Sequence, residues 1–179
     1  NGVSIPTSEH VLAALVWLET DNVLIELNVS EPPIMAGSSI HFVDASLKAG
    51  IEEHDAERYE YVVRENITFA DEENGSEITV IPADNYQVTT MVDFGTKVLG
   101  TQNANLKNLA DFKDQFANAR TFSFLHEIES LLEHGLIKGG DLNNAIVYVD
   151  KELSEETMSK LCKAFNRNSI SMKPNGILD

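Results

Sequence analysis

The sequence predicts an α+β fold in two parts, with layers of helix and antiparallel sheet. Two observations predict it: apolar residues recur at helical spacing near both ends of the chain, and at every second position through its middle. A third, an acidic run at 52–57 with no core pattern, places a linker between the parts. We therefore expect one domain over residues 1–55 and a second over residues 56–179.

The first part is predicted to begin with a helix and a strand. Residues 7–19 carry one helical stripe of apolar side chains, and Thr7 or Ser8 can cap this helix. Residues 22–29 alternate apolar and polar side chains, which is typical of a half-buried strand. Proline cannot continue a strand ladder, so the strand should end before Pro32.

A second helix is expected between the strand and the acidic linker. Ser38 or Ser39 can cap its start, and apolar residues then recur at helical spacing. Gly50 suits the left-handed position that commonly follows the last turn of a helix.

The second part is predicted to open with an antiparallel meander. Between residues 59 and 94, apolar side chains take alternate positions in runs separated by turn residues at 73–75 and 82–85. Helical spacing then predicts two helices, at about 105–117 and about 124–134.

The end of the chain is predicted to add a strand and a helix. Residues 143–150 include a continuous apolar run, which favours a strand buried on both faces. Ser154 is well placed to cap a last amphipathic helix.

The charge of the chain excludes two classes of partner. Lys and Arg total 13 against 29 Asp and Glu, a formal net charge of -16. A general nucleic-acid or anionic-membrane surface needs clustered Lys and Arg, so neither is expected. No apolar run is long enough to cross a membrane, and we expect no stable membrane insertion. The single cysteine, Cys162, allows no internal disulfide and favours a cytoplasmic location.

Glu9 and His10 are the first candidates for chemistry, because both fall in the first turn of a predicted helix. Free backbone N–H groups create positive potential there, which favours a carboxylate and the neutral imidazole that a metal ligand requires. A carboxylate beside a metal-bound water is what a hydrolytic base needs. Glutamate is also common at helix starts without any catalytic role, so spacing alone leaves both interpretations open.

Three further motifs have competing interpretations. The Thr121 hydroxyl precedes a predicted helix, so it either caps that helix or donates to an oxyanion. His126, Glu129 and Glu133 share one helical face, which we interpret as a solvated polar face. Gly139-Gly140 lacks the Lys-Ser/Thr pair of a phosphate loop, so a tight turn is favoured.

Several separate motifs occur in order along nearly the whole chain. They are Pro6-Thr7-Ser8-Glu9-His10-Val11-Leu12-Ala13-Ala14-Leu15, Asp21-Asn22-Val23-Leu24-Ile25-Glu26, Pro33-Ile34-Met35-Ala36-Gly37-Ser38-Ser39, Val92-Asp93-Phe94, Ala119-Arg120-Thr121-Phe122 and the run from Gly135 to Val147. Together they resemble the zinc-dependent UDP-3-O-acyl-N-acetylglucosamine deacetylases of lipid A synthesis. The chain is most similar to the Bacteroidetes-type branch, whose members are often fused to a 3-hydroxyacyl-carrier-protein dehydratase.

This resemblance implies a reaction and a role for four residues. The family hydrolyses the N-acetyl group of UDP-3-O-(3-hydroxyacyl)-N-acetylglucosamine, releasing acetate and a free amine. By resemblance, His10 is one of three Zn²⁺ ligands and Glu9 is the base that activates water. Thr121 is expected to stabilise the tetrahedral oxyanion, and Phe94 to stack on the uracil ring.

The resemblance also implies a βαβ-type insert over about 122–146 in the second domain. Its apolar walls are expected to form a passage for the acyl chain. The residues concerned are Phe122, Phe124, Leu136, Ile137 and Leu142, for which plain core packing is an equal alternative.

The chain departs from the family pattern in ways that matter for catalysis. By resemblance, the N-terminal domain lacks its first strands, and the chain ends before the His-Lys-x-x-Asp motif that carries the other two zinc ligands. We therefore expect a fragment that binds zinc weakly and is inactive alone, because one imidazole cannot fix the ion. Ala36 and Asn103 stand where an acidic residue and a histidine are usual. The alternative is a non-catalytic relative or binding module with the same fold.

Overall fold

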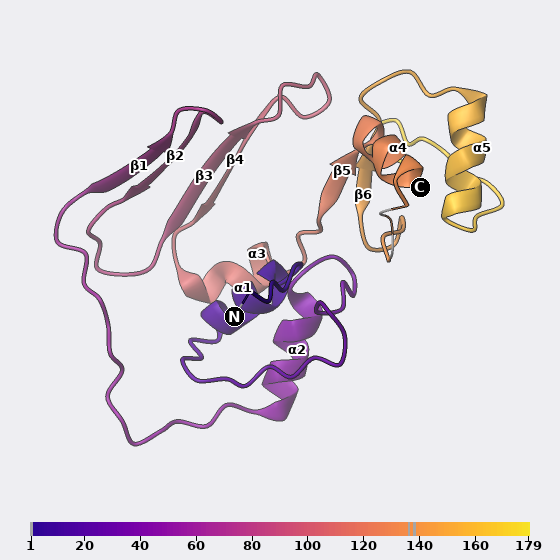
Figure 1. The fold of residues 1–179 in the computed structure, drawn as a ribbon. Coiled ribbons are helices and arrows are strands. Elements are labelled where there is room, and N and C mark those ends of the chain that lie inside the picture. Colours follow the sequence, from indigo (N-terminus) through magenta and orange to yellow (C-terminus); the bar gives the residue numbers. More distant parts are fainter. Residues whose placement is uncertain (1, 136, 138) are drawn as a thin grey trace.

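The computed structural model describes residues 2–135, 137 and 139–179 (Figure 1). In the described residues, two helices are followed by four strands, and helices and short strands then alternate to the end of the chain; the strands pair into separate two-stranded sheets. The predicted α+β class is therefore confirmed. Within the described residues, none of the helices combines the length and the apolar character needed to span a bilayer.

The two helices predicted in the first part are confirmed as α1 (Glu9–Trp17) and α2 (Ile40–Ala49). Ser8 and Ser39 occupy their N-caps, but neither side chain makes a capping hydrogen bond. The two helices pack against each other and against a segment from later in the chain. Their shared core contains Ala14, Val43 and Ala117, with Trp17, Ile40, Phe42 and Phe112 partly buried against it.

The strand predicted at 22–29 is wrong. These residues have no regular secondary structure, and Leu24 is 82% exposed. A strand forms only when its backbone pairs with a neighbour, and no described segment forms a ladder with this one. The alternating pattern is real, but by itself it cannot create the hydrogen bonds that define a strand.

Two antiparallel hairpins stand where the meander was predicted. They are β1 (Ile67–Asp71) with β2 (Ser76–Val80), and β3 (Val88–Asp93) with β4 (Thr101–Leu106). The antiparallel pairing is as predicted, but β2 does not pair with β3 and the first strand starts at residue 67 rather than 59. In the first hairpin one face is apolar and exposed, and it carries the cross-strand pairs Ile67–Val80 and Phe69–Ile78.

The helix predicted over about 105–117 is wrong in its first half. The backbone up to Leu106 belongs to β4, because every residue of that strand pairs with β3. A short 3-10 helix, η1 (Leu109–Asp111), and α3 (Phe112–Gln115) follow. The Asn108 side chain caps η1 by accepting a hydrogen bond from its second residue. Strand pairing therefore outweighs the helical spacing of the apolar residues here.

The predicted βαβ arrangement is confirmed in the second part. β5 (Phe122–Phe124) and β6 (Ile146–Tyr148) pair in parallel, and α4 (Leu125–Glu133) lies between them in sequence. At the centre of β6, Val147 is buried, whereas the residues on either side are half-buried. The predicted burial of this strand on both faces therefore holds only at its centre.

The last helix, α5 (Glu155–Ala164), begins as predicted at Ser154, whose hydroxyl accepts a hydrogen bond from the Thr157 N–H at 3.1 Å. This helix closes the larger core of the chain over the βαβ unit. The buried members of that core are Leu125, Ile128, Val147, Leu161, Ile170 and Leu178.

Residues 50–66 form no helix, and no strand before β1. Arg58 ties this segment to the end of α1: its Nε lies 2.9 Å from Asp21 Oδ2, and its Nη2 donates to the Glu19 carbonyl oxygen at 2.7 Å. Hydrogen bonds that Arg58 donates to Glu19 and then to Asp21 raise the pKa of Arg58 above its usual value. A division into domains near residue 55 stays a prediction.

Candidate functional site

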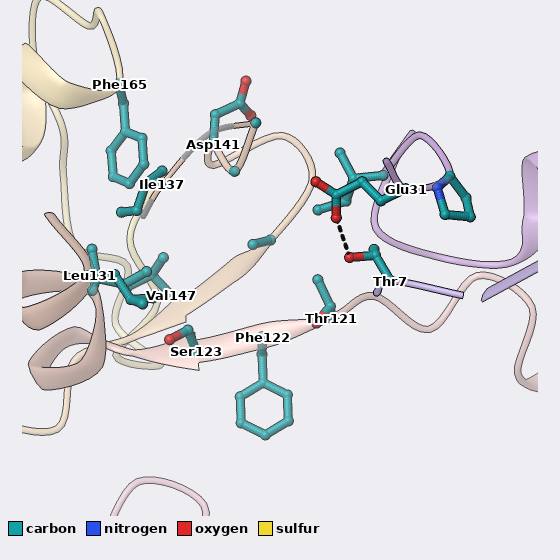
Figure 2. Close-up of a pocket in the computed structure, with 16 residues that line it drawn as sticks. Thr7, Glu31, Thr121, Phe122, Ser123, Leu131, Ile137, Asp141, Val147 and Phe165 are labelled. Carbon is teal, nitrogen blue, oxygen red and sulfur yellow. Dashed lines mark hydrogen bonds between the residues drawn. The ribbon is translucent and has the colours of Figure 1, made fainter. Parts of the chain in front are cut away.

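A cavity of about 270 Å³ lies between the segments flanking α1 and the βαβ unit. Figure 2 shows that it has two chemically different ends. Thr7, Glu31 and Thr121 gather at one end, which is polar. The other end is mainly apolar and contains Leu131, Ile137, Val147 and Phe165, with Ser123 beside them. Of these, Val147 belongs to the larger core, and Ile137 and Phe165 pack against it.

Thr121 is held at the polar end by backbone hydrogen bonds on both sides. Its N–H donates to the Gly37 carbonyl oxygen at 2.7 Å, and its own carbonyl accepts from the Ile146 N–H at 3.0 Å. The loop before α2, the start of β5 and the start of β6 are therefore joined at this residue. Because α4 begins at Leu125, Thr121 does not cap that helix, which removes one of its two interpretations.

The contact between Gly37 and Thr121 is possible only without a side chain at position 37. Gly37 has φ +68°, and a Cβ built on it would lie 1.8 Å from the Asn144 carbonyl oxygen. Atoms that are not bonded cannot approach so closely, so only glycine fits. The Ala36-Gly37 turn thus packs directly on the loop that leads into β6.

Asn144 organises that loop, and sequence reasoning missed it. Its side chain is buried, its Nδ2 donates to the Gly139 carbonyl at 2.7 Å, and its Oδ1 accepts from the Asp141 N–H at 2.8 Å. Gly139 itself lies in a bend, and with Gly140 and Asp141 it lines the cavity. One buried amide therefore fixes the loop that forms a wall of the site.

The polar end of the cavity also contains a side-chain pair that the sequence did not indicate. The Thr7 hydroxyl donates to Glu31 Oε2 at 2.7 Å, and both residues are half-buried (Figure 2). Thr7 lies two residues before Glu9. The start of α1 is therefore brought to the same cavity as Thr121.

Glu9 and His10 occupy the first turn of α1, as predicted. The His10 side chain is 15% exposed and the Glu9 side chain 65% exposed, and His10 Nε2 lies 3.9 Å from Glu9 Oε1. Neither residue lines the cavity. The structure thus brings the turn before them to Thr121, and leaves the Glu9 carboxylate facing solvent.

Phe94 belongs to an aromatic cluster beside β5. Its ring centroid lies 5.2 Å from that of Phe122 and 6.2 Å from that of Phe124, both in edge-on geometry. Tyr148 of β6 completes the cluster. Phe94 is half-buried, and the cluster fixes its position relative to the βαβ unit.

The residues expected in the acyl passage are not all found at the cavity. Phe122 and Ile137 line it, although the Phe122 ring points to the opposite side of β5 from Thr121 (Figure 2). Leu142 packs against the larger core, and Phe124 is buried in the aromatic cluster. Leu136 lies outside the described residues.

The polar face of α4 makes ionic contacts instead of facing only solvent. His126 Nδ1 contacts the Asp150 carboxylate, and Glu129 contacts Lys151 and Thr157. Hydrogen bonds from Lys151 and then Thr157 lower the pKa of Glu129 below its usual value. These contacts tie α4 to the segment between β6 and α5 and to the first turn of α5.

The comparison with known protein families places this site in context. The chain matches the family model described as LpxC, UDP-3-O-acyl N-acetylglycosamine deacetylase, over residues 1–166. It belongs to the LpxC family. The resemblance inferred from its motifs is therefore confirmed, and the match includes both the start of α1 and Thr121.

Individual LpxC relatives agree with the family match. The chain is 43% identical over 161 residues to the bifunctional enzyme LpxC/FabZ of Bacteroides thetaiotaomicron, covering 90% of this chain and 35% of that protein. It is 41% identical over 180 residues to the bifunctional enzyme LpxC/FabZ of Chlorobaculum tepidum, covering 99% and 38%. The UDP-3-O-acyl-N-acetylglucosamine deacetylase of Phenylobacterium zucineum is 38% identical over 147 residues, covering 82% and 50%. The chain thus spans about a third to a half of the length of these relatives.

The LpxC family implies a zinc ion, and the described residues do not fit one by themselves. Zinc in hydrolases takes three protein ligands and leaves one position open. In the part of the chain that the structure describes, no three His, Cys, Asp or Glu side chains are grouped to hold a metal. His10 with the neighbouring Glu9 supplies at most a partial donor set.

Proposed function

We propose that the protein containing this chain removes the N-acetyl group from UDP-3-O-(3-hydroxyacyl)-N-acetylglucosamine as a zinc-dependent hydrolase in lipid A synthesis. The observation that carries the proposal is the meeting of Thr121 and the turn before Glu9 at one cavity, in a chain of the LpxC family. Amide hydrolysis needs a proton-transfer group and an oxyanion donor near one another. These two segments supply candidates for both.

In this proposal Glu9 is the general base. It takes a proton from the attacking water and returns it to the leaving amine, while a new C–O bond forms and the amide C–N bond breaks. It lies in the first turn of α1, at the positive end of the helix dipole. Thr121 donates its hydroxyl hydrogen to the developing oxyanion. The backbone hydrogen bonds at its N–H and at its carbonyl hold Thr121 in place, so little reorganisation is needed when the oxyanion forms.

His10 is proposed as one zinc ligand of the complete protein. Because the described residues do not group three ligands, the remaining donors would have to come from elsewhere in that protein. We therefore propose that the present chain, taken alone, does not hold zinc tightly and does not turn over substrate.

The two ends of the cavity support the proposed substrate. A volume of about 270 Å³ is close to the lower limit for a small-molecule pocket, about 300 Å³, so it suits one part of a large amphiphilic ligand. The apolar end, with Ile137, is proposed to receive the acyl chain, and the polar end the sugar. The proposed passage for the acyl chain also includes Phe122, Leu136 and Leu142. Phe94 is proposed to contact the uracil ring.

The test is acetate release from UDP-3-O-acyl-N-acetylglucosamine by the full-length protein and by the isolated chain. The proposal expects release by the full-length protein with zinc, and none by the isolated chain. Thr121→Ala in the full-length protein should lower kcat by about 10²-fold, the typical effect of losing one oxyanion donor. Binding of the substrate without any release would favour the alternative, a non-catalytic binding module.

A further inference from the structure

Thr7 holds a backbone conformation that its side chain disfavours. Its φ is +57°, in the left-handed region that a β-branched residue rarely adopts. Such conformations persist only where surrounding contacts impose them, and they concentrate at functional sites. The contact made by this side chain is the hydrogen bond from its hydroxyl to Glu31 Oε2, at 2.7 Å (Figure 2).

Glu31, the acceptor of that hydrogen bond, lies in a restricted stretch of backbone. It precedes Pro32 and Pro33, and a residue before proline is restricted to extended conformations. Pro32 is buried and lines the cavity beside Glu31. The carboxylate is therefore anchored to the cavity wall by a stiff segment of backbone.

The start of α1 has no side-chain cap, although its later residues pack in a core with α2. Ser8 occupies the N-cap, but its side chain makes no capping hydrogen bond. Among the side-chain hydrogen bonds of the described residues, the Thr7–Glu31 bond is the one that joins the turn before α1 to a distant segment, 24 positions away. This bond therefore connects the turn that leads into Glu9 to the segment before Pro32.

We propose that Glu31 is a positioning residue, which acts through Thr7 to hold the first turn of α1 and the Glu9 carboxylate in register with Thr121. The proposal rests on the function proposed above, in which Glu9 is the base. Glu31 does not touch the reacting atoms. Its effect is to limit the displacement of a group whose misplacement by about 1 Å can cost about 10²-fold in rate.

The test compares variants of the full-length protein that remove or keep the acceptor and the donor. Glu31→Ala removes the acceptor, whereas Glu31→Gln keeps an amide oxygen that can accept from Thr7. Thr7→Val removes the donor, whereas Thr7→Ser keeps it. We expect Glu31→Ala and Thr7→Val to lower kcat by about 10- to 100-fold with little change in KM, and the conservative variants to keep most activity.

Combining Glu31→Ala with Thr7→Val should lower kcat no further than either single variant, because both remove the same hydrogen bond. Glu26→Ala is the matched control, since Glu26 is an exposed carboxylate of the same segment and should leave kcat unchanged. Equal losses in Glu31→Gln and Glu31→Ala, or fully additive losses in the double variant, would overturn the proposal.

A second readout does not need activity. The Leu12 N–H donates to the Ser8 carbonyl at 3.0 Å, which is a hydrogen bond of the first turn of α1. Glu31→Ala should speed hydrogen exchange at the Leu12 amide by about tenfold, and Glu26→Ala should not. Unchanged exchange in Glu31→Ala would overturn the positioning role. If the wild-type protein releases no acetate while Glu31→Ala still speeds exchange, the proposed function fails but the anchoring of α1 stands.

Discussion

The backbone N–H of Thr121 donates to the carbonyl oxygen of Gly37 at 2.7 Å. The two residues are 84 positions apart in the sequence, and their hydrogen bond connects the loop before α2 to the start of β5. Thr121 and Thr7, in the turn before the proposed base, both line one cavity. We call the contact between Gly37 and Thr121 the junction, and its stability should limit the activity of the protein.

Gly37→Ala should strongly destabilise the junction. The added Cβ would meet the Asn144 carbonyl oxygen at 1.8 Å, and alanine at φ +68° is strained in any surroundings. We expect the free energy of unfolding to fall by about 2–4 kcal/mol in urea denaturation. Gly75→Ala is the matched control, because Gly75 has φ +66° with nothing within 4 Å of the added Cβ. It should cost about 1 kcal/mol, and equal losses in both variants would contradict the steric explanation.

Asn144→Ala should destabilise the loop that leads into β6. The substitution leaves the Gly139 carbonyl and the Asp141 N–H without their partner, at a site where Asn144 is only 8% exposed. The expected loss in free energy of unfolding is about 2 kcal/mol. Its neighbour Asn143 is exposed, and its side chain accepts a hydrogen bond from the half-buried Arg167, so Asn143→Ala should cost about 0.5 kcal/mol. A loss as large in Asn143→Ala would show that Asn144 has no special role.

Glu129→Gln should change how stability depends on pH. The contact with Lys151, followed by that with Thr157, lowers the pKa of Glu129 in the folded state. A carboxyl group with a lowered folded-state pKa stabilises the protein above its unfolded pKa, and loses this contribution as pH falls through the folded value. The free energy of unfolding of the wild type should therefore exceed that of Glu129→Gln by up to about 1 kcal/mol near pH 7, after allowance for solvent screening.

That difference should shrink steadily as the pH falls below about 4.3, the ordinary pKa of a glutamate. Chemical denaturation at a series of pH values measures it. Glu133→Gln, at an exposed position of the same helix, should show no such trend. A difference between wild type and Glu129→Gln that stays constant down to pH 2 would contradict the proposed ion pair.

His10→Ala should lower the zinc content of the full-length protein. His10 is proposed as one ligand of three, and the loss of one ligand weakens zinc binding by a large factor. His54→Ala is the control, since His54 lies in the exposed segment after α2. Metal analysis after dialysis gives the stoichiometry, and an unchanged zinc content in His10→Ala would exclude His10 as a ligand.

The helices were the most predictable part of the fold, because their signals are local. The apolar stripe of α1 and the cap at Ser154 depend on residues within two turns of each other. Strands depend on distant partners, which the sequence does not name. Residues 22–29 alternate correctly but lack a partner in the described chain, and residues 101–106 pair with β3 despite helical spacing nearby.

The candidate site was predictable only where it follows family motifs. Glu9, His10 and Thr121 are proposed as site residues in this way, and α1 begins where the sequence predicts it. Glu31 and Asn144 were missed, because each acts through hydrogen bonds that become visible only when the chain is folded. A glutamate before two prolines and an asparagine in a turn are ordinary features of a sequence.

The central claim is that Glu9 is the base of an amide hydrolase, and one measurement tests it most directly. Acetate release from UDP-3-O-acyl-N-acetylglucosamine should be compared in the full-length protein and its Glu9→Ala variant, with zinc content determined in both. We expect Glu9→Ala to keep its zinc and to lose at least about 10²-fold in kcat, as the removal of a general base does. Near-normal turnover by a zinc-loaded Glu9→Ala protein would contradict the assignment.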